Sequence, residues 1–148
     1  MAAQDETGLP VLIVPQLNPD ATAPNWPAQR VAIAWDGSRA AARAVRDALP
    51  LMRAARHVEV ICVEAHAEAA QPVAAALVVH WLGRHGLAAE LTQVGHVDST
   101  VAEAIIARAD AVHADLLVMG TSGLGLAPMG RVTKQVLRST RLPLLVSA

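Results

Sequence analysis

The feature that most constrains this chain is a series of short apolar runs that alternate with longer helix-like stretches. Four of these runs are almost uninterrupted: "VAIAW", "HVEVICV", "ADLLVMG" and "LPLLVSA", at residues 31–35, 57–63, 114–120 and 142–148. Continuous apolar runs of this length are typical of strands buried on both faces, as in parallel sheets. A more polar run, "AAELTQV" at 88–94, predicts a further strand near a sheet edge.

Helical patterns fill the intervals between the runs. They predict helices at 38–52, 72–86, about 98–111 and about 130–139, the third capped by Asp98 or Ser99. Regular alternation of strand and helix predicts an α/β fold: a single open, doubly wound, mainly parallel sheet with helices on both faces. We expect the strand order 3-2-1-4-5, counted from the strand at 31–35.

The fold class predicts where a functional site would lie. In an open α/β sheet, ligands bind outside the carboxyl ends of the strands, at the point where the winding reverses. In this order that point falls between the first and fourth strands. Asp36 follows the first of these strands and Gly120 ends the fourth. We therefore expect Asp36 and Gly120 to face each other across one cleft.

Composition narrows the class of function. The 148 residues fit one domain, and 53% of them are hydrophobic, which is ample for a core. The only aromatic residues apart from histidine are Trp26, Trp35 and Trp81, and the formal net charge is -1. Both facts argue against nucleic-acid binding, which uses stacking aromatics and a basic field. A single cysteine, no visible secretory signal and no apolar segment of about 18–20 residues predict a cytoplasmic protein without a membrane partner.

Three stretches together resemble one known family. "VAIAWDGSRAAARAV", "ADLLVMGTSG" and "GRVTKQVLRSTRLPLLV" occur here in the order found in the universal stress proteins, and the resemblance covers nearly everything from Arg30 to Ala148. It implies an α/β fold of the adenine-nucleotide-binding type, a homodimer and a non-catalytic role in surviving stress. We accordingly divide the chain into an N-terminal extension, 1–29, and a universal stress protein domain, 30–148.

The extension carries one predicted strand. "LPVLIVP", residues 9–15, is similar to the chain's own ending, "LPLLVSA". By resemblance it matches the last strand of the first half of tandem two-domain family members, so the chain resembles their second half. An unpaired edge strand is a template for pairing, and in the family the fifth strands pair antiparallel in the dimer. We expect Val11, Leu12, Ile13 and Val14 to pair with Leu144, Leu145 and Val146, within one chain or across a homodimer.

The stretch "VMGTSGLGLAPMGRVTKQVL" has the layout of a phosphate site: a strand, a glycine-rich loop and a helix. Nucleotide-binding family members have Gly, two residues, Gly, nine residues, then Gly followed by Ser or Thr. Gly120, Gly123 and Gly130 take the three glycine positions, but only residues 124–129 separate the last two, and Arg131 replaces the hydroxyl residue. The shorter loop loses up to about 10 Å of chain length. The phosphate half of the site therefore departs from the family pattern.

Two of these residues allow alternative interpretations. Arg131 either offers a charged fork to phosphate oxygens or is a solvated arginine of the first helical turn. The resemblance implies that Asp36 receives the adenine or ribose and that the backbone of Val63 flanks the base. Without a ligand, Asp36 would serve as a turn residue before the helix.

Other chemistry finds little support in the sequence. His80 and His85 are five residues apart, a poor spacing for zinc, and His66 with His96 lacks a clear third ligand. No serine has an evident histidine and carboxylate as partners, so we expect neither a metal site nor an enzyme. Two hypotheses remain: a binding module for ATP, ADP or AMP, and a nucleotide-free dimeric adaptor. A very slow ATPase is a third, minor alternative.

Overall fold

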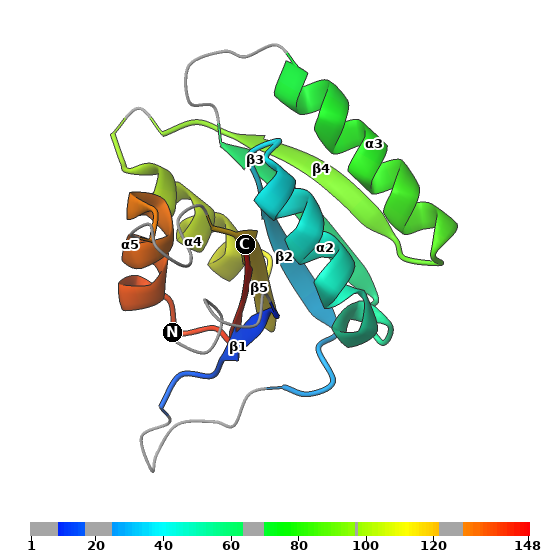
Figure 1. Ribbon diagram of the computed structural model, residues 1–148, viewed down its shortest axis with the longest axis horizontal. Helices are drawn as coiled ribbons and strands as arrows, with labels where there is room; N and C mark the ends of the chain where they lie inside the picture. The colour runs from blue at the N-terminus through cyan, green and yellow to red at the C-terminus, as the bar shows by residue number, and fades with distance from the viewer. Residues whose placement is uncertain (1–8, 17–24, 64–69, 97, 122–128) are drawn as a thin grey trace.

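One sheet runs through the molecule, and its strands come from both ends of the chain (Figure 1). The computed structural model describes residues 9–16, 25–63, 70–96, 98–121 and 129–148. The strands are β1 (Val11–Ile13), β2 (Arg30–Trp35), β3 (His57–Val63), β4 (Ala89–Val94), β5 (Leu116–Gly120) and β6 (Leu144–Ser147). The helices are α2 (Arg39–Met52), α3 (Ala70–Arg84), α4 (Val101–Ala111) and α5 (Arg131–Ser139).

The sheet has the order β1-β6-β5-β2-β3-β4, and β2 to β6 run parallel to one another. Counted from β2, this is the expected order 3-2-1-4-5, with β1 added as a sixth strand beside β6. The α/β class and the doubly wound sheet are therefore confirmed. β4 lies at the other edge and is only partly buried, as its polar residues predicted.

β1 pairs antiparallel with β6 of the same chain. Val11 lies opposite Val146, Leu12 opposite Leu145 and Ile13 opposite Leu144, so the expected pairing is present. Val14 is the exception, because it follows the strand instead of belonging to it. β1 thus joins the sheet that the other five strands form.

Two hydrophobic layers hold the helices onto the sheet. Val31, Ile33 and Trp35 of β2 pack toward α2 and α3, whereas Ala32 and Ala34 pack toward α4 and α5. Figure 1 shows these two pairs of helices on opposite sides of the strands. The alternation explains why β2 is apolar at almost every position: both of its faces are covered.

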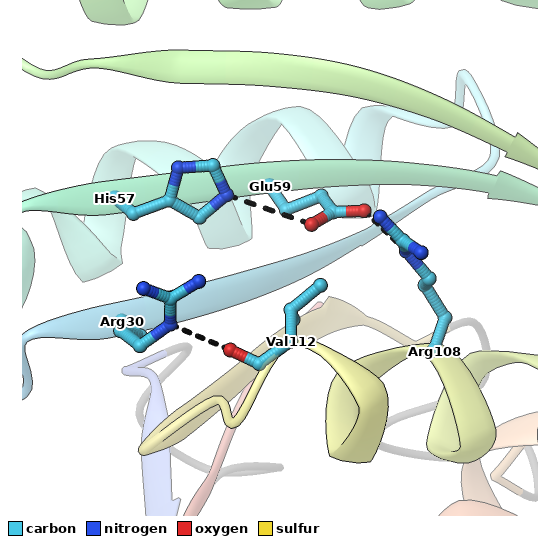
Figure 2. Close-up of polar contacts among 5 residues, drawn as sticks. All are labelled: Arg30, His57, Glu59, Arg108 and Val112. Carbon is cyan, nitrogen blue, oxygen red and sulfur yellow. Dashed lines mark hydrogen bonds and ion pairs between the residues drawn. The ribbon is translucent and has the colours of Figure 1, made fainter.

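The end of the sheet at which the strands begin is closed by polar contacts (Figure 2). Glu59 of β3 is buried and accepts a hydrogen bond from Nε of Arg108 in α4, while its other carboxylate oxygen lies 3.5 Å from Nε2 of His57. Nε of Arg30 donates to the carbonyl of Val112, 2.6 Å away. A buried carboxylate is tolerated here because its oxygens have partners.

The pKa of Glu59 reflects this environment. Burial acts to raise the pKa, but hydrogen bonds from Arg108, Thr92 and His57 and the charge of Arg108 outweigh burial. The pKa of Glu59 therefore lies below its ordinary value, and the carboxylate is ionised at neutral pH.

The starts of α2 and α4 are fixed by side-chain caps. Ser38 Oγ accepts from the N–H of Ala41 at 3.0 Å and caps α2. The prediction that Asp98 or Ser99 caps α4 is wrong by one or two residues. Thr100 is the cap, and with Glu103 it forms a reciprocal capping box in which each side chain accepts from the other's backbone N–H.

Candidate functional site

A cavity of about 260 Å³ lies outside the carboxyl ends of β2, β3 and β5. Asp36, Val63, Gly120, Gly130 and Arg131 all line it, although they are spread over the whole domain in sequence. The expected meeting of Asp36 with Gly120 is therefore present. The sixth predicted residue, Gly123, lies outside the residues that the structure describes.

Asp36 has a structural role as well as a place in the cavity wall. Its Oδ1 accepts from the N–H of Ser38 at 2.9 Å, and Gly37 between them has a φ of 79°, which favours glycine. This turn carries the chain from β2 into α2. Asp36 therefore serves as the turn residue before α2, and its carboxylate also lies at the rim of the cavity.

Gly120 has a packing role that the sequence did not reveal. A Cβ at this position would lie 2.3 Å from the carbonyl carbon of Ala40 and from the backbone nitrogen of Ala41. Only a residue without a side chain lets the first turn of α2 approach the end of β5 so closely. Gly120 therefore determines how α2 sits against the sheet, whether or not a ligand contacts it.

The start of α5 is open, in contrast to α2 and α4. Gly130 is its N-cap, has no side chain to accept a hydrogen bond, and no acidic residue follows in the first turn. The exposed Arg131 adds a positive charge at the same place. First-turn N–H groups that no side chain of the described residues caps, next to a cation, form an environment that favours an anion.

The remaining lining residues were missed in the sequence. Thr133, one turn after Gly130, brings a hydroxyl-bearing side chain to the cavity. Its spacing of three from Gly130 was the available signal, because residues three apart share a helix face. The apolar part of the wall comes from several elements and includes Ala34, Ile61, Val101, Ile105 and Met119. No pattern within one segment marks these side chains as neighbours.

The sequence also predicts that the chain has no metal site and no membrane-spanning segment. Within the described residues, no group of three His, Cys, Asp or Glu side chains is placed to hold a metal ion. His66 lies outside those residues. Cys62 is buried in β3, and burial raises the pKa of its thiol, which keeps it protonated. None of the helices in the described part of the chain is both long and apolar enough to cross a membrane.

Comparison with known proteins supplies independent evidence. The model of the universal stress protein family matches residues 27–147. No curated protein matches the chain.

Solved structures with this fold are numerous. A universal stress protein from Archaeoglobus fulgidus DSM 4304 is 22% identical with a TM-score of 0.71, over 97% of this chain and 50% of that chain. This chain therefore spans half the length of that protein. A universal stress protein in complex with cAMP is 25% identical with a TM-score of 0.65, over 82% of this chain and 97% of that chain. A second Archaeoglobus fulgidus universal stress protein is 20% identical with a TM-score of 0.64, over 81% and 98% of the two chains.

Proposed function

This chain belongs to the universal stress protein family, and from that premise we propose that it is a non-catalytic stress-response protein of the cytoplasm that binds an adenine nucleotide. One observation carries the proposal: five residues at positions that the family pattern assigns to the nucleotide line a single cavity, although Arg131 departs from the pattern at its position. A relative of similar length has a structure in complex with cAMP, which supports the same ligand class for this chain.

The cavity offers a different environment to each part of a nucleotide. Its apolar wall, with Ile61, Ile105 and Met119, suits the faces of a purine ring. The Asp36 carboxylate suits the hydroxyl groups of a ribose, since an ionised carboxylate only accepts hydrogen bonds. The open start of α5 at Gly130, with Arg131 beside it, suits a phosphate.

The size of the site favours a short phosphate tail. A volume of about 260 Å³ is below the range of roughly 300–1,000 Å³ common for ligand pockets. The loop that would cover a longer tail is three residues shorter than in nucleotide-binding family members. We therefore propose that AMP and cyclic AMP bind more tightly than ADP, and ADP more tightly than ATP.

Isothermal titration calorimetry with these four nucleotides tests the proposal. Arg131→Ala removes one charged hydrogen-bonding group and should weaken AMP binding about tenfold, while adenosine binding stays nearly unchanged. Arg138→Ala, at the other end of α5 and outside the cavity, is the matched control. Asp36→Ala should abolish binding. Asp36→Asn keeps the turn before α2, so it separates loss of the turn from loss of the carboxylate.

Saturable AMP binding that is weakened by Arg131→Ala but not by Arg138→Ala would support the site. Absence of saturable binding at millimolar AMP, cyclic AMP, ADP and ATP would refute it. Release of inorganic phosphate from ATP, measured alongside, tests the non-catalytic part. Turnover that Asp36→Ala removes would replace a binding role with that of a slow ATPase.

A second candidate function is that of a dimeric adaptor without nucleotide. Large apolar side chains gather along the N-terminal edge: Leu9, Leu12 and Val14 are 62%, 38% and 54% exposed. Because β1 covers the β6 edge, a homodimer would form through the outer side of β1 or by exchange of β1 between chains. Sedimentation equilibrium should then show a dimer that Leu12→Lys weakens and Leu77→Lys, at an exposed site on α3, does not. A monomer at all concentrations would exclude this candidate.

A further inference from the structure

A second cavity lies between α2 and α3, on the opposite face of the sheet from the nucleotide crevice. Its volume is about 280 Å³, and α2 contributes Ala42, Val45 and Arg46 to its wall. Leu77 and Trp81 of α3 form the facing side. Figure 1 shows α2 and α3 running side by side over the same face of the sheet. The small side chain of Ala42, which is itself exposed, leaves the space between the helices open.

The cavity is apolar and partly open to water. Leu77 is 65% exposed although it lines the cavity, and Trp81 is half-buried. Apolar surface that stays in contact with water is unfavourable relative to buried apolar surface. An apolar group that enters between Leu77 and Trp81 would remove that surface from water. The walls therefore favour a ligand with an aromatic or aliphatic body.

The rim adds the positive charge of Arg46. Arg46 has no hydrogen-bond or ion-pair partner among the described residues. Its neighbours on α2 are engaged: Arg43 donates to the carbonyl of Ala148, and Asp47 accepts from Ser147 Oγ at 2.6 Å. A guanidinium beside an apolar cavity is suited to a carboxylate, which it can bind through two parallel hydrogen bonds.

The indole of Trp35, which lines both cavities, is a further polar group without a partner among the described residues. Trp35 belongs to the core layer under α2 and α3 and also lines the cavity. Its Nε1 is buried and has no hydrogen-bond acceptor within the described part of the chain. Buried donors are normally paired, and each unpaired one reduces stability.

We propose that the cavity between α2 and α3 binds a small monocarboxylate, with its aromatic or aliphatic body between Leu77 and Trp81 and its carboxylate on Arg46. The size supports a molecule of one ring and a short chain. A dry cavity of about 150 Å³ holds benzene, and this one is nearly twice as large. The site is separate from the nucleotide crevice, so the proposal does not depend on nucleotide binding.

The test uses 4-phenylbutyrate as the probe and the three tryptophans as reporters. The full-length chain gives three indole N–H signals, from Trp26, Trp35 and Trp81. Titration followed by two-dimensional ¹H–¹⁵N NMR should shift the Trp81 signal saturably and leave that of Trp26 in place. Trp81 is the decisive reporter, because Trp35 lines both cavities. The uncharged analogue 4-phenylbutanol should bind about two- to fivefold more weakly, since it cannot pair with Arg46.

Two variants at exposed positions make the result decisive. Ala42→Phe fills the cavity and should abolish the Trp81 shift, and Arg46→Gln should weaken 4-phenylbutyrate about two- to fivefold but leave 4-phenylbutanol unaffected. Arg53→Gln, at the C-cap of α2 and outside the cavity, should match the unmodified chain. Absence of a saturable Trp81 shift, or a shift that survives Ala42→Phe, would overturn the proposal. Equal affinity for acid and alcohol would overturn the role of Arg46. If the Trp81 signal shifts with protein concentration in the absence of the probe, a second copy of the chain occupies the cavity instead.

Discussion

The two ends of the sheet differ in how their polar groups are paired. Where the strands begin, Glu59, Arg108 and His57 interact with one another, and Asp115 accepts from the N–H groups of Gln29 and Arg30 at 2.9 Å each. Where the strands end, a cavity remains and α5 starts without a cap. The polar contacts where the strands begin connect β2 and β3 to the C-terminal part of α4. Where the strands end, backbone N–H groups of the first turn of α5 lack a side-chain cap among the described residues. The paired polar groups therefore lie at one end of the strands, and the proposed nucleotide site lies at the other.

The largest expected effect lies at the end of the sheet where the strands finish. It tests whether Gly120 is needed there for the stability of the fold. Gly120→Ala places a Cβ 2.3 Å from backbone atoms of Ala40 and Ala41, which cannot move without shifting α2. We expect a loss of about 3 kcal/mol in the free energy of unfolding, measured by urea denaturation. Gly95→Ala is the control, because an added Cβ there meets no atom within 4 Å. Equal stability of the two variants would show that the close approach to α2 is not a requirement.

The next largest effect on stability is expected at the end of the sheet where the strands begin. Arg108→Ala leaves the buried carboxylate of Glu59 without its main partner, and we expect a loss of about 2–3 kcal/mol in the free energy of unfolding. Arg108 is 37% exposed, so water compensates part of the loss. Arg138→Ala, an exposed arginine of α5, should change stability by less than about 0.5 kcal/mol. A loss in Arg138→Ala as large as that in Arg108→Ala would contradict the assignment.

The contacts of Glu59 with Arg108 and His57 predict that the free energy of unfolding depends on pH. The folded pKa of Glu59 lies below the ordinary value of 4.5, so the stability it contributes is complete above that pH. It is lost as the pH falls through the lower, folded pKa, because the folded state then takes up a proton that the unfolded state already holds. Glu59→Gln should lack this component. The difference in unfolding free energy between the unmodified chain and Glu59→Gln should shrink below about pH 4.5, and a constant difference would contradict the prediction.

A smaller effect compares the starts of α4 and α5 on the same face of the sheet. Thr100→Ala removes the capping box and should cost about 1 kcal/mol. Gly130→Asp adds a cap and a negative charge at the open start, and should stabilise the fold by a few tenths of a kcal/mol. If a phosphate binds there, Gly130→Asp also weakens AMP while leaving adenosine unchanged. Calorimetry that finds AMP and adenosine equally affected would place the phosphate elsewhere.

The sequence predicted those parts of the fold that depend on local pattern and topology. Continuous apolar runs separated by helices indicated the parallel arrangement of β2 to β6, and the unpaired edge strand together with the resemblance to the universal stress proteins indicated the pairing of β1 with β6. The same topology placed Asp36 and Gly120 at one crevice. These predictions succeeded because they require only the direction of each strand and the side on which it ends.

The parts that the sequence did not reveal depend on side chains from distant segments. Glu59 and Arg108 are 49 positions apart, and nothing in either segment marks the other as its partner. The packing role of Gly120 arises from the path of α2, which no glycine pattern encodes. The cap of α4 is different, because Thr100 with Glu103 three residues later is a readable capping box, and Asp98 and Ser99 are cap formers that lack it.

The strand β1 has a consequence for how this protein meets other chains. It is tethered to β2 by residues 14–29, so its addition to β6 is an intramolecular event. A short tether of this kind corresponds to an effective concentration in the millimolar range. Any free peptide or neighbouring molecule that would extend the sheet at β6 has to compete with that built-in occupant. Because β1 is now the edge strand, any further strand on this side would add to β1 and not to β6.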